Sequence, residues 1–444
     1  MIFDSCYFRA KIGIDSGQLL ARTRLEGKDQ MKAGKLFLIM LLSCGLLVEC
    51  AILYYFLVFV PTKLPFKPPE RYLLEVAKEE IPRFTYWEDD YQELKEAFQG
   101  EEGFLLQKIA NGEKLSFGET KLAASLVKES AELLLQTLQE VKSEEELNRL
   151  IRKRFTIYQA AGEEGEGKVL FTGYYSPICE GSLEKQGPFK YPLYLIPKDL
   201  KVANLGEFDS TLEGERIVYR IDPTREEVVP YWSREDIVKD KVLKGQNLEF
   251  VYLKDRLDRF YLMIEGSGKI TLANGKSFWL RYSATNGRPY TSLGTSLAKA
   301  GKLPEDMLSL QSIRQYFQRH PQEMDHYLNQ NERFVFFVED EQNQGAIGAA
   351  GVVLTPERSI AIDRRIFPLG TLAYIEYPEP EINGQGKVVR YAEKGRFVFC
   401  QDTGGIIKGP GRADIYFGEG ERAFAKAGNI KGKGRLYFLL KKSG

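Results

Sequence analysis

A glycine-rich bend between two apolar segments constrains the fold of the C-terminal region most strongly. Cys400–Gly409 contains Asp402, and Arg412–Gly418 contains Asp414 twelve positions later. Both aspartates stand beside apolar residues typical of strands, and the intervening glycines permit a sharp turn and a close approach of a ligand to the backbone. Two carboxyl groups beside such a bend could face one cleft, which suits protonation of a leaving group. Their spacing alone also fits aspartates that merely stabilise turns.

The composition predicts a folded chain with more than one core. A length of 444 residues exceeds the usual size of a single hydrophobic core, and 43% hydrophobic residues argue against global disorder. Lysine plus arginine and aspartate plus glutamate both number 62. This balance gives no sign of a nucleic-acid partner, and it is compatible with an uncharged sugar polymer as ligand.

The N-terminal region, residues 1–61, predicts a membrane anchor or a signal. Leu36–Val60 is a nearly continuous apolar run that is long enough to span a bilayer, and lysines precede it. Alternatively, Met31 is the true start and Cys44 is lipidated after cleavage. An uncleaved helix is favoured because the run stays apolar after Cys44. The prolines that follow predict an extended stalk over 62–86.

The pattern along the rest of the chain is helical first and then mainly β. Helices are expected between residues 87 and 160, with Ser143 and Glu146 forming a cap. Asn274-Gly275 predicts a hairpin, residues 308–328 a helical pair and residues 421–427 a short helix. Strands are expected at Val169–Tyr175, Tyr191–Ile196, Glu249–Leu253, Arg259–Ile264 and from Phe334 onwards. Many short strands separated by turns are typical of barrels.

Several common kinds of active site do not fit the sequence. His320 and His326 are the only histidines, which argues against a histidine-based triad and leaves few ligands for zinc. Residues 162–169 approach a phosphate-binding loop, but Val169 replaces the required serine or threonine. Cys179 and Cys400 are expected to be buried free thiols, although a bridge between them stays open. Carboxylates are the remaining acid–base candidates, and no metal or organic cofactor is expected.

The aspartate segments resemble the three-aspartate barrel domain of the membrane-bound lytic transglycosylase A family. The other pieces of the family pattern occur in order: Phe171–Pro177, Tyr191–Tyr194, Ile264–Gly268, Ser312–Arg314, Asn331–Phe337 and, with Asp363, Ser359–Thr371. The resemblance covers roughly residues 70–440. It implies a mainly β fold with flanking helices, in which residues 87–177 and 311–444 form a double-psi β-barrel. Residues 178–310 would be an inserted, smaller, barrel-like β domain that forms the other wall of a glycan groove.

The resemblance implies a lytic transglycosylase, a carbon–oxygen lyase that acts on peptidoglycan during cell-wall turnover. Such an enzyme cleaves the β-1,4 bond between N-acetylmuramic acid and N-acetylglucosamine and leaves a 1,6-anhydro end. Asp414 matches the catalytic acid/base of the family. Asp402 is either a second catalytic group or a residue that organises the turn, and Asp363 matches a structural aspartate.

The resemblance also suggests residues that bind substrate. These are Thr172, Tyr174, Tyr175, Gly266, Ser267, Gly268, Gly404, Gly405 and Lys408. The chain departs from the family pattern at Glu265, where a neutral amide is expected, and at Ile406, where a smaller residue is common.

The expected partners are peptidoglycan glycan strands and, through the anchor, a membrane. Cell-wall synthesis proteins are further candidates, and a periplasm-facing monomer in the cell envelope is expected. Two alternatives stay open. One is a water-using glycoside hydrolase with Asp402 and Asp414 as its carboxylate pair. The other is a non-catalytic module that binds cell-wall polysaccharide.

Overall fold

The computed structural model describes residues 71–86, 90–212, 215–340, 345–384 and 387–442. The chain divides into two compact units, residues 1–67 and 68–444, and all of the described residues belong to the second. The predicted anchor and Cys44 therefore lie outside the described residues. Within those residues, no helix has both the length and the apolar character needed to cross a bilayer.

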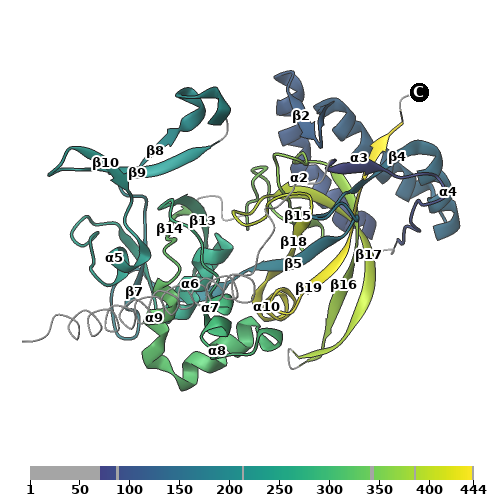
Figure 1. Cartoon of the computed structure of the whole chain (residues 1–444). Coiled ribbons are helices and arrows are strands. Elements are labelled where there is room, and N and C mark those ends of the chain that lie inside the picture. The colour runs from purple at the N-terminus through teal and green to yellow at the C-terminus, as the bar shows by residue number, and fades with distance from the viewer. Residues whose placement is uncertain (1–70, 87–89, 213–214, 341–344, 385–386, 443–444) are drawn as a thin grey trace, which may run out of the picture. The chain divides into compact units, whose positions relative to one another are not determined.

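Six strands close into a barrel (Figure 1). In order around the ring they are β19 (Lys431–Lys441), β16 (Leu372–Ile382), β17 (Val388–Asp402), β15 (Ser359–Ala361), β18 (Arg412–Glu419) and β5 (Val169–Ser176). The ring closes because β5 pairs with β19 as well as with β18. The structure thus confirms a mainly β fold with a closed barrel. The double-psi crossing of its strands stays a prediction.

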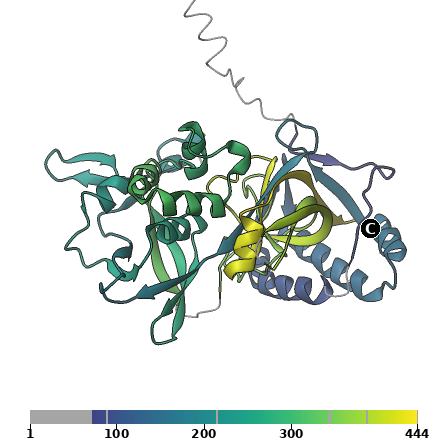
Figure 2. The same ribbon diagram turned by 90° about the horizontal axis from the view of Figure 1, so that it is seen from below.

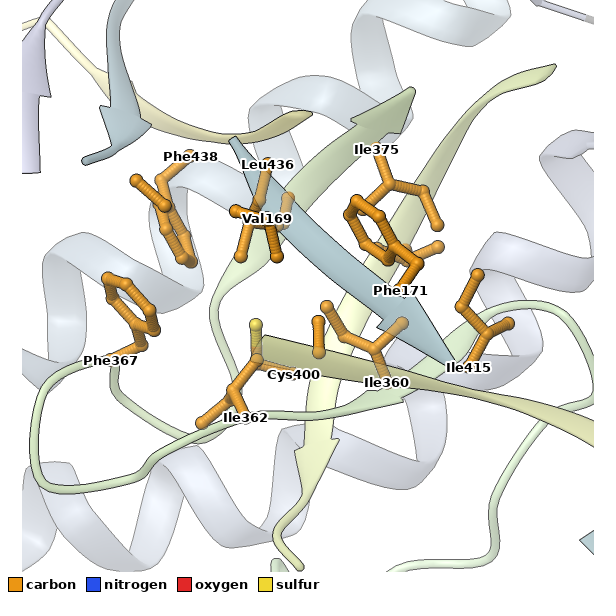
Figure 3. Close-up of a cluster of buried hydrophobic side chains, with 14 of the residues drawn as sticks. Val169, Phe171, Ile360, Ile362, Phe367, Ile375, Cys400, Ile415, Leu436 and Phe438 are labelled. Atoms are coloured by element: carbon orange, nitrogen blue, oxygen red, sulfur yellow. The ribbon is translucent and has the colours of Figure 1, made fainter. Parts of the chain in front are cut away.

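Alternation along the strands fills the barrel interior and leaves the polar residues outside. Figure 3 shows the apolar core, to which Val169 and Phe171 of β5, Ile415 of β18 and Cys400 of β17 contribute. Because successive side chains of a strand point to opposite faces, Thr172 and Asp414 belong to the outer face. The same period of two places Tyr174 of β5 and Tyr416 of β18 on that outer face.

Helices cover two sides of the barrel. A hydrophobic cluster joins α2 (Asp90–Ala110), α3 (Ala124–Glu140) and α4 (Glu144–Arg154) to outward-facing residues of β16, β17 and β19. The hairpin of β2 (Lys114–Phe117) and β3 (Thr120–Ala123) lies between α2 and α3 in the sequence. The hydroxyl of Ser143 accepts the backbone N–H of Glu146 at the start of α4, which confirms the predicted cap. On another side, α10 (Gly420–Ala427) lies against β5 and β18 (Figure 2).

Residues 71–86 of the segment predicted as a stalk belong to the globular body instead. Within it, β1 (Leu73–Glu75) pairs with β4 (Phe155–Ala160), which in turn extends the barrel sheet next to β19. Phe84 is fully buried and its ring lies 4.8 Å from that of Tyr374. The prolines before residue 70 suggested a spacer, but the apolar residues after it belong to the globular body.

The chain after β5, from Ile178 to Asp340, forms the inserted β domain. Its six-stranded sheet consists, in spatial order, of β14 (Val335–Asp340), β13 (Ser277–Thr285), β12 (Gly268–Leu272), β6 (Ile178–Ser182), β11 (Glu249–Leu253) and β7 (Tyr191–Tyr194). Figure 1 shows a separate three-stranded sheet of β8 (Lys201–Asn204), β9 (Arg216–Asp222) and β10 (Glu227–Pro230). The remaining helices are α5 (Arg234–Val238), α6 (Arg256–Glu265), α7 (Leu293–Lys299), α8 (Leu310–Arg319) and α9 (Met324–Asn329), and the 3-10 turns are η1 (Leu205–Glu207), η2 (Ser210–Leu212), η3 (Glu305–Met307) and η4 (Pro321–Glu323).

The strand predicted over Arg259–Ile264 is wrong, because these residues belong to helix α6. The side chain of Asp255 accepts the backbone N–H groups of Leu257 and Asp258 and so caps the helix start. Gly266 ends the helix with a φ of 79°, in the left-handed region that favours glycine. These two capping residues outweigh the β-forming tendency of the short apolar run between them.

The domain boundary predicted at residue 310 does not coincide with the strand pairing. Strand β14 pairs with β13 and so belongs to the inserted sheet, and residues of α8 and α9 share a core with α6 and α7. The insertion therefore continues to about Asp340. The predicted hairpin at Asn274-Gly275 and the predicted short helix near Glu421 are both confirmed. Cys179 and Cys400 are buried and free, as expected.

Candidate active site

Two adjacent parallel strands bring three of the predicted site residues together, with Tyr416 beside them. In the register of β5 and β18, Asp414 lies opposite Thr172 and Tyr416 lies opposite Tyr174. Gly173 separates the two β5 residues, and a Cβ there would lie only 2.6 Å from the ring of Phe417. The glycine is therefore required where Phe417 and Ile430 of the barrel core pack closely against β5.

Strand β15 places Asp402 and Asp414 at the same level of the barrel. Ala361 pairs with Asp402 on one side, through β17, and with Asp414 on the other, through β18. Since neighbouring strands lie 4.7–4.9 Å apart, the two aspartate backbones are separated by about 10 Å. The predicted proximity of the two carboxyl-bearing segments thus follows from one short strand between them.

Asp414 is a largely buried acid that solvent still reaches. Its side chain is 17% exposed. The hydroxyl of Thr172 donates to its Oδ1, and the Nη2 of Arg412 lies 3.5 Å from the same oxygen while also donating to Thr172. Burial raises the pKa of Asp414, and Thr172 and Arg412 offset only part of that effect. The site therefore favours the protonated carboxyl more than water would.

Asp402 is held on both of its oxygens. The hydroxyl of Tyr174 donates to Oδ2 at 2.8 Å, and the backbone N–H groups of Ala349 and Thr403 donate to Oδ1 at 2.9 and 2.8 Å. Burial raises the pKa of Asp402 to about 6, against the opposing effect of these donors, and the charge of Asp414 raises it slightly further. Its contacts suit a fixed carboxylate that organises the turn and orients its neighbours.

Asp363 has the surroundings of a structural residue. It is 1% exposed. Arg365 donates to both of its oxygens, from Nε at 3.0 Å and from Nη2 at 2.8 Å, and the backbone N–H of Gly409 donates at 2.9 Å. Although burial opposes ionisation, these donors lower the pKa of Asp363. The charged carboxylate thereby ties the end of the glycine-rich bend to the segment after β15.

The bend itself lies against an arginine that the sequence pattern did not select. A Cβ on Gly404 would lie 2.6 Å from Ile407, and one on Gly405 would lie 2.7 Å from Nη1 of Arg333. Arg333 is fixed by donating to the backbone oxygen of Arg288 at 3.1 Å. Lys408 is exposed. The two glycines are thus needed for packing, and Gly405 also brings the bend close to a cation.

The other predicted substrate-binding residues divide into accessible and structural ones. Ser267 is half-buried, whereas Gly266 caps α6 and a Cβ on Gly268 would lie 2.8 Å from the backbone oxygen of Pro177. Tyr175 is only 6% exposed and packs edge-on against Phe424. Its ring is thus part of the barrel core. Tyr174 and Thr172 are half-buried and bonded to the aspartates.

Sequence reasoning did not select Arg412, Arg333 or Ala349 as site residues. The position of Arg412 could have been found, because it stands two residues before Asp414 and hence on the same face of the strand. Nothing in the sequence links the backbone N–H of Ala349 to Asp402. Glu265 was noticed only as a departure from the family pattern, yet its Oε2 accepts the N–H of Tyr175 at 3.4 Å.

Among the described residues, no group of three or more histidine, cysteine, aspartate or glutamate side chains could hold a metal ion. A pocket of about 270 Å³ lies between the start of α6 and the ends of α8 and η4, with Tyr191, Arg256 and Arg314 in its lining. None of the predicted catalytic or substrate-binding residues lines it.

Known proteins share both the sequence and the fold. Residues 170–338 match the family described as the MltA specific insert domain, and residues 358–440 match the 3D domain. The membrane-bound lytic murein transglycosylase A of Escherichia coli K12 is 31% identical over 288 residues, which are 64% of this chain and 68% of that protein. The corresponding protein of Vibrio cholerae is 30% identical over 283 residues, which are 63% and 68% of the two chains.

Solved structures match over most of the described residues. A structure of MltA from Neisseria gonorrhoeae matches with a TM-score of 0.62 and 26% identity, over 85% of this chain and 97% of that one. The structure of E. coli MltA with bound chitohexaose matches with a TM-score of 0.63 and 23% identity, over 86% and 98% of the two chains, and shows likeness of fold alone. The carboxyl cluster on the barrel, the two matched domains and these relatives all agree. The chain therefore belongs to the membrane-bound lytic murein transglycosylase A family.

Proposed function

We propose that this protein is a peptidoglycan lytic transglycosylase with Asp414 as its acid/base. The observation that carries the proposal is the state of Asp414, a carboxyl that is accessible, bonded to Thr172 and shifted towards its protonated form. A general acid must hold its proton until the leaving group takes it, and a raised pKa serves that need. Membership of the family supports the same reaction, since the relatives are named for it.

Asp414 would act twice in one turnover. It first gives its proton to the glycosidic oxygen between N-acetylmuramic acid and N-acetylglucosamine while the bond from that oxygen to C1 breaks. The resulting carboxylate then takes the proton of the C6 hydroxyl of the same muramic residue, and O6 bonds to C1. The 1,6-anhydro ring closes, no water is consumed and Asp414 regains its proton. One carboxyl suffices because the substrate supplies the nucleophile.

Thr172, Arg412 and Asp402 would support the two steps. The hydroxyl of Thr172 and the guanidinium of Arg412 stabilise the Asp414 carboxylate between the steps, which keeps the rise in its pKa moderate. We infer that Asp402 is the organising residue, because Tyr174, Thr403 and Ala349 all donate to its carboxylate and fix its orientation.

Glycan strands are the proposed ligand, as the chitohexaose in the E. coli structure supports. Ser267, Gly404 and Gly405 are accessible enough to contact sugar, and exposed Lys408 stays a candidate. Gly266, Gly268 and Tyr175 would contribute through the backbone positions that they fix. The double-psi crossing implied by the family resemblance is proposed for the barrel as well.

We propose a periplasm-facing position in the cell envelope, supported by the membrane-bound relatives. The apolar run Leu36–Val60 would hold the chain in a membrane as an uncleaved helix, and lipidation of Cys44 is the alternative. A monomer that works beside cell-wall synthesis proteins is the expected arrangement.

The product identifies the reaction directly. The full-length protein is incubated with purified peptidoglycan sacculi in water enriched in oxygen-18. The masses of the soluble fragments are then determined by mass spectrometry. A transglycosylase gives 1,6-anhydromuramic ends without the heavy oxygen. A hydrolase that uses Asp402 and Asp414 gives reducing ends that carry it.

The two other outcomes are also informative. Sedimentation of the protein with sacculi without any new ends would identify a binding module and end the enzyme proposal. Labelled reducing ends as the main product would replace the transglycosylase by a hydrolase on the same barrel.

A further inference from the structure

Glu265 is a carboxyl group that comes from the inserted domain and contacts the strand of the active site. It is the last residue of α6, and Gly266 turns the chain away directly after it. Its Oε2 accepts the backbone N–H of Tyr175 at 3.4 Å. Tyr175 follows Tyr174 on β5, the strand that also carries Thr172. This contact places the acid beside β5, which pairs with the strand that holds Asp414.

Among the described residues, those with the largest effect on the pKa of Glu265 include no cation. The groups that act on it are the N–H of Tyr175 and the charge of Asp414, and burial raises its pKa to about 8. The phenols of Tyr175, Tyr261, Tyr290 and Tyr416 lie close enough to feel its charge. Of the nearby arginines among the described residues, Arg314 is bound to Asp258 of α6 and Arg333 donates to the backbone of Arg288.

We propose that Glu265 is a third carboxyl group of the active site and a positioning residue that, while neutral, donates a hydrogen bond to an acceptor oxygen of the bound sugar. The proposal rests on the proposed function. Glu265 is half-buried, and its Oε1 makes no hydrogen bond to the described residues, so one oxygen remains for a ligand. A protonated carboxyl can donate from that position, whereas a carboxylate can only accept.

Ionisation of Glu265 would disturb the reaction in two ways. The donor to the sugar would be lost, so bound substrate would be less well oriented. The new negative charge would also oppose the carboxylate that Asp414 must become after it has delivered its proton. Both effects act in the same direction, so turnover should fall as the pH rises through the pKa of Glu265.

The test compares pH profiles of the full-length protein. The value of kcat/KM for release of soluble fragments from sacculi is measured between pH 5 and pH 10 for the wild type, Glu265→Gln and Glu376→Gln. Glutamine keeps the shape and an N–H donor at every pH. Glu376 on β16 is a suitable control because burial also raises its pKa, but it lies near Arg435 and Tyr437, away from the aspartates.

Ionisation of Asp414 gives every variant an alkaline limb that approaches tenfold per pH unit, as expected for one essential proton. Above about pH 8 this limb should steepen for the wild type and Glu376→Gln as Glu265 also ionises, whereas Glu265→Gln should keep the slope of a single proton. Glu265→Asp, which retains the acid, should also show the steeper limb. The proposal is overturned if Glu265→Gln shows the same alkaline limb as the wild type.

A second measurement separates this proposal from the proposed function. If the wild type cleaves no sacculi at any pH, the proposed function fails. The affinity for chitohexaose is then followed over the same pH range. A wild-type affinity that weakens above about pH 8, with no such change in Glu265→Gln, would support the hydrogen bond to sugar. Identical pH dependence of the two affinities would refute it.

Discussion

Two groups of buried carboxyls in this protein have opposite acidities. Glu357 and Glu379 share Arg396 and Lys426, with Arg396 and Lys426 each 2.7 Å from an oxygen of Glu379. Although burial opposes ionisation, the two cations lower the pKa of Glu357 to about 2 and that of Glu379 as well. Asp402, Asp414 and Glu265 are also buried to a large extent, yet burial dominates there and the pKa of each is raised.

The difference lies in the partners and not in the depth of burial. Around Glu357 and Glu379, two cations neutralise two carboxylates, which stabilises the charged forms. Around the active-site carboxyls, hydroxyl and amide donors predominate, and Arg412 lies 3.5 Å from Asp414. Only in the second group do the surroundings favour the protonated form of the carboxyl. A carboxyl that stabilises the fold and one that performs acid catalysis thus differ in the cations placed beside them.

The largest expected effect belongs to Asp414→Asn. The change keeps the shape of the side chain and removes its transferable proton, so kcat should fall by at least ~10²–10⁴-fold. The temperature of thermal unfolding should change little, because Arg412, the cation beside Asp414, also donates a hydrogen bond to Thr172. Release of fragments from sacculi and the melting temperature are measured together.

Asp209→Asn, at an exposed position of the inserted domain, is the matched control and should leave both quantities unchanged. Activity of Asp414→Asn close to that of the wild type would show that another group supplies the proton.

Arg396→Met should produce the largest loss of stability. Arg396 contacts both Glu357 and Glu379 and is 8% exposed, so its removal leaves buried carboxylates with one cation between them. Breaking a buried pair from one side costs about 3–5 kcal/mol. Chemical denaturation followed by circular dichroism measures the free energy of unfolding.

Arg390→Met offers a comparison on the same strand. Arg390 pairs with Glu381, but its side chain is 72% exposed. An exposed ion pair is screened by solvent and contributes little to stability, so this variant should be nearly as stable as the wild type. Equal losses in the two variants would mean that burial does not distinguish the two ion pairs.

Glu101 should have a smaller effect on the free energy of unfolding, and this effect should depend on pH. In the part of the chain that the structure describes, neither oxygen of this fully buried residue of α2 has a well-formed hydrogen bond. Burial raises the pKa of Glu101 to about 7, an effect that the nearby side chain of Gln401 reduces in part. Since the folded pKa lies above the unfolded value of 4.5, the associated stability is complete below pH 4.5 and is lost as the pH rises through 7. The loss should reach about 3 kcal/mol.

The difference in unfolding free energy between the wild type and Glu101→Gln isolates this contribution. As the pH rises from 4.5 to 8, the wild type should lose stability relative to the variant. A constant difference over that range would contradict a buried neutral Glu101.

Part of this arrangement could be predicted from the sequence. The period of two along Val169–Tyr175 and Arg412–Gly418 predicts that Thr172 and Tyr174 share a face, as do Asp414 and Tyr416. The glycine-rich bend predicts a turn between Asp402 and Asp414. These features are local, because side-chain direction in a strand and turn formation depend on neighbouring residues.

The rest depends on contacts between distant segments. The N–H of Ala349 on Asp402 and the approach of Arg333 to Gly405 join residues that no local pattern relates. The position of β14 in the inserted sheet likewise could not be read from its own sequence. The wrongly predicted strand at Arg259–Ile264 is different. Asp255 and Gly266 are local signals of a helix start and a helix end, and they could have been given more weight than the apolar run between them.

The protonation of the two groups of carboxyls can be measured directly. Carbon-13 labelling of aspartate and glutamate carboxyls in the full-length protein allows each signal to be titrated by NMR, with Asp414→Asn and Glu357→Gln used to assign the two decisive signals. The predicted result is that the Asp414 signal titrates above 3.8, the usual value for aspartate, while the Glu357 signal titrates near 2. An Asp414 signal that titrates at or below its usual value would contradict the claim that the active site holds a proton on this residue before substrate binds.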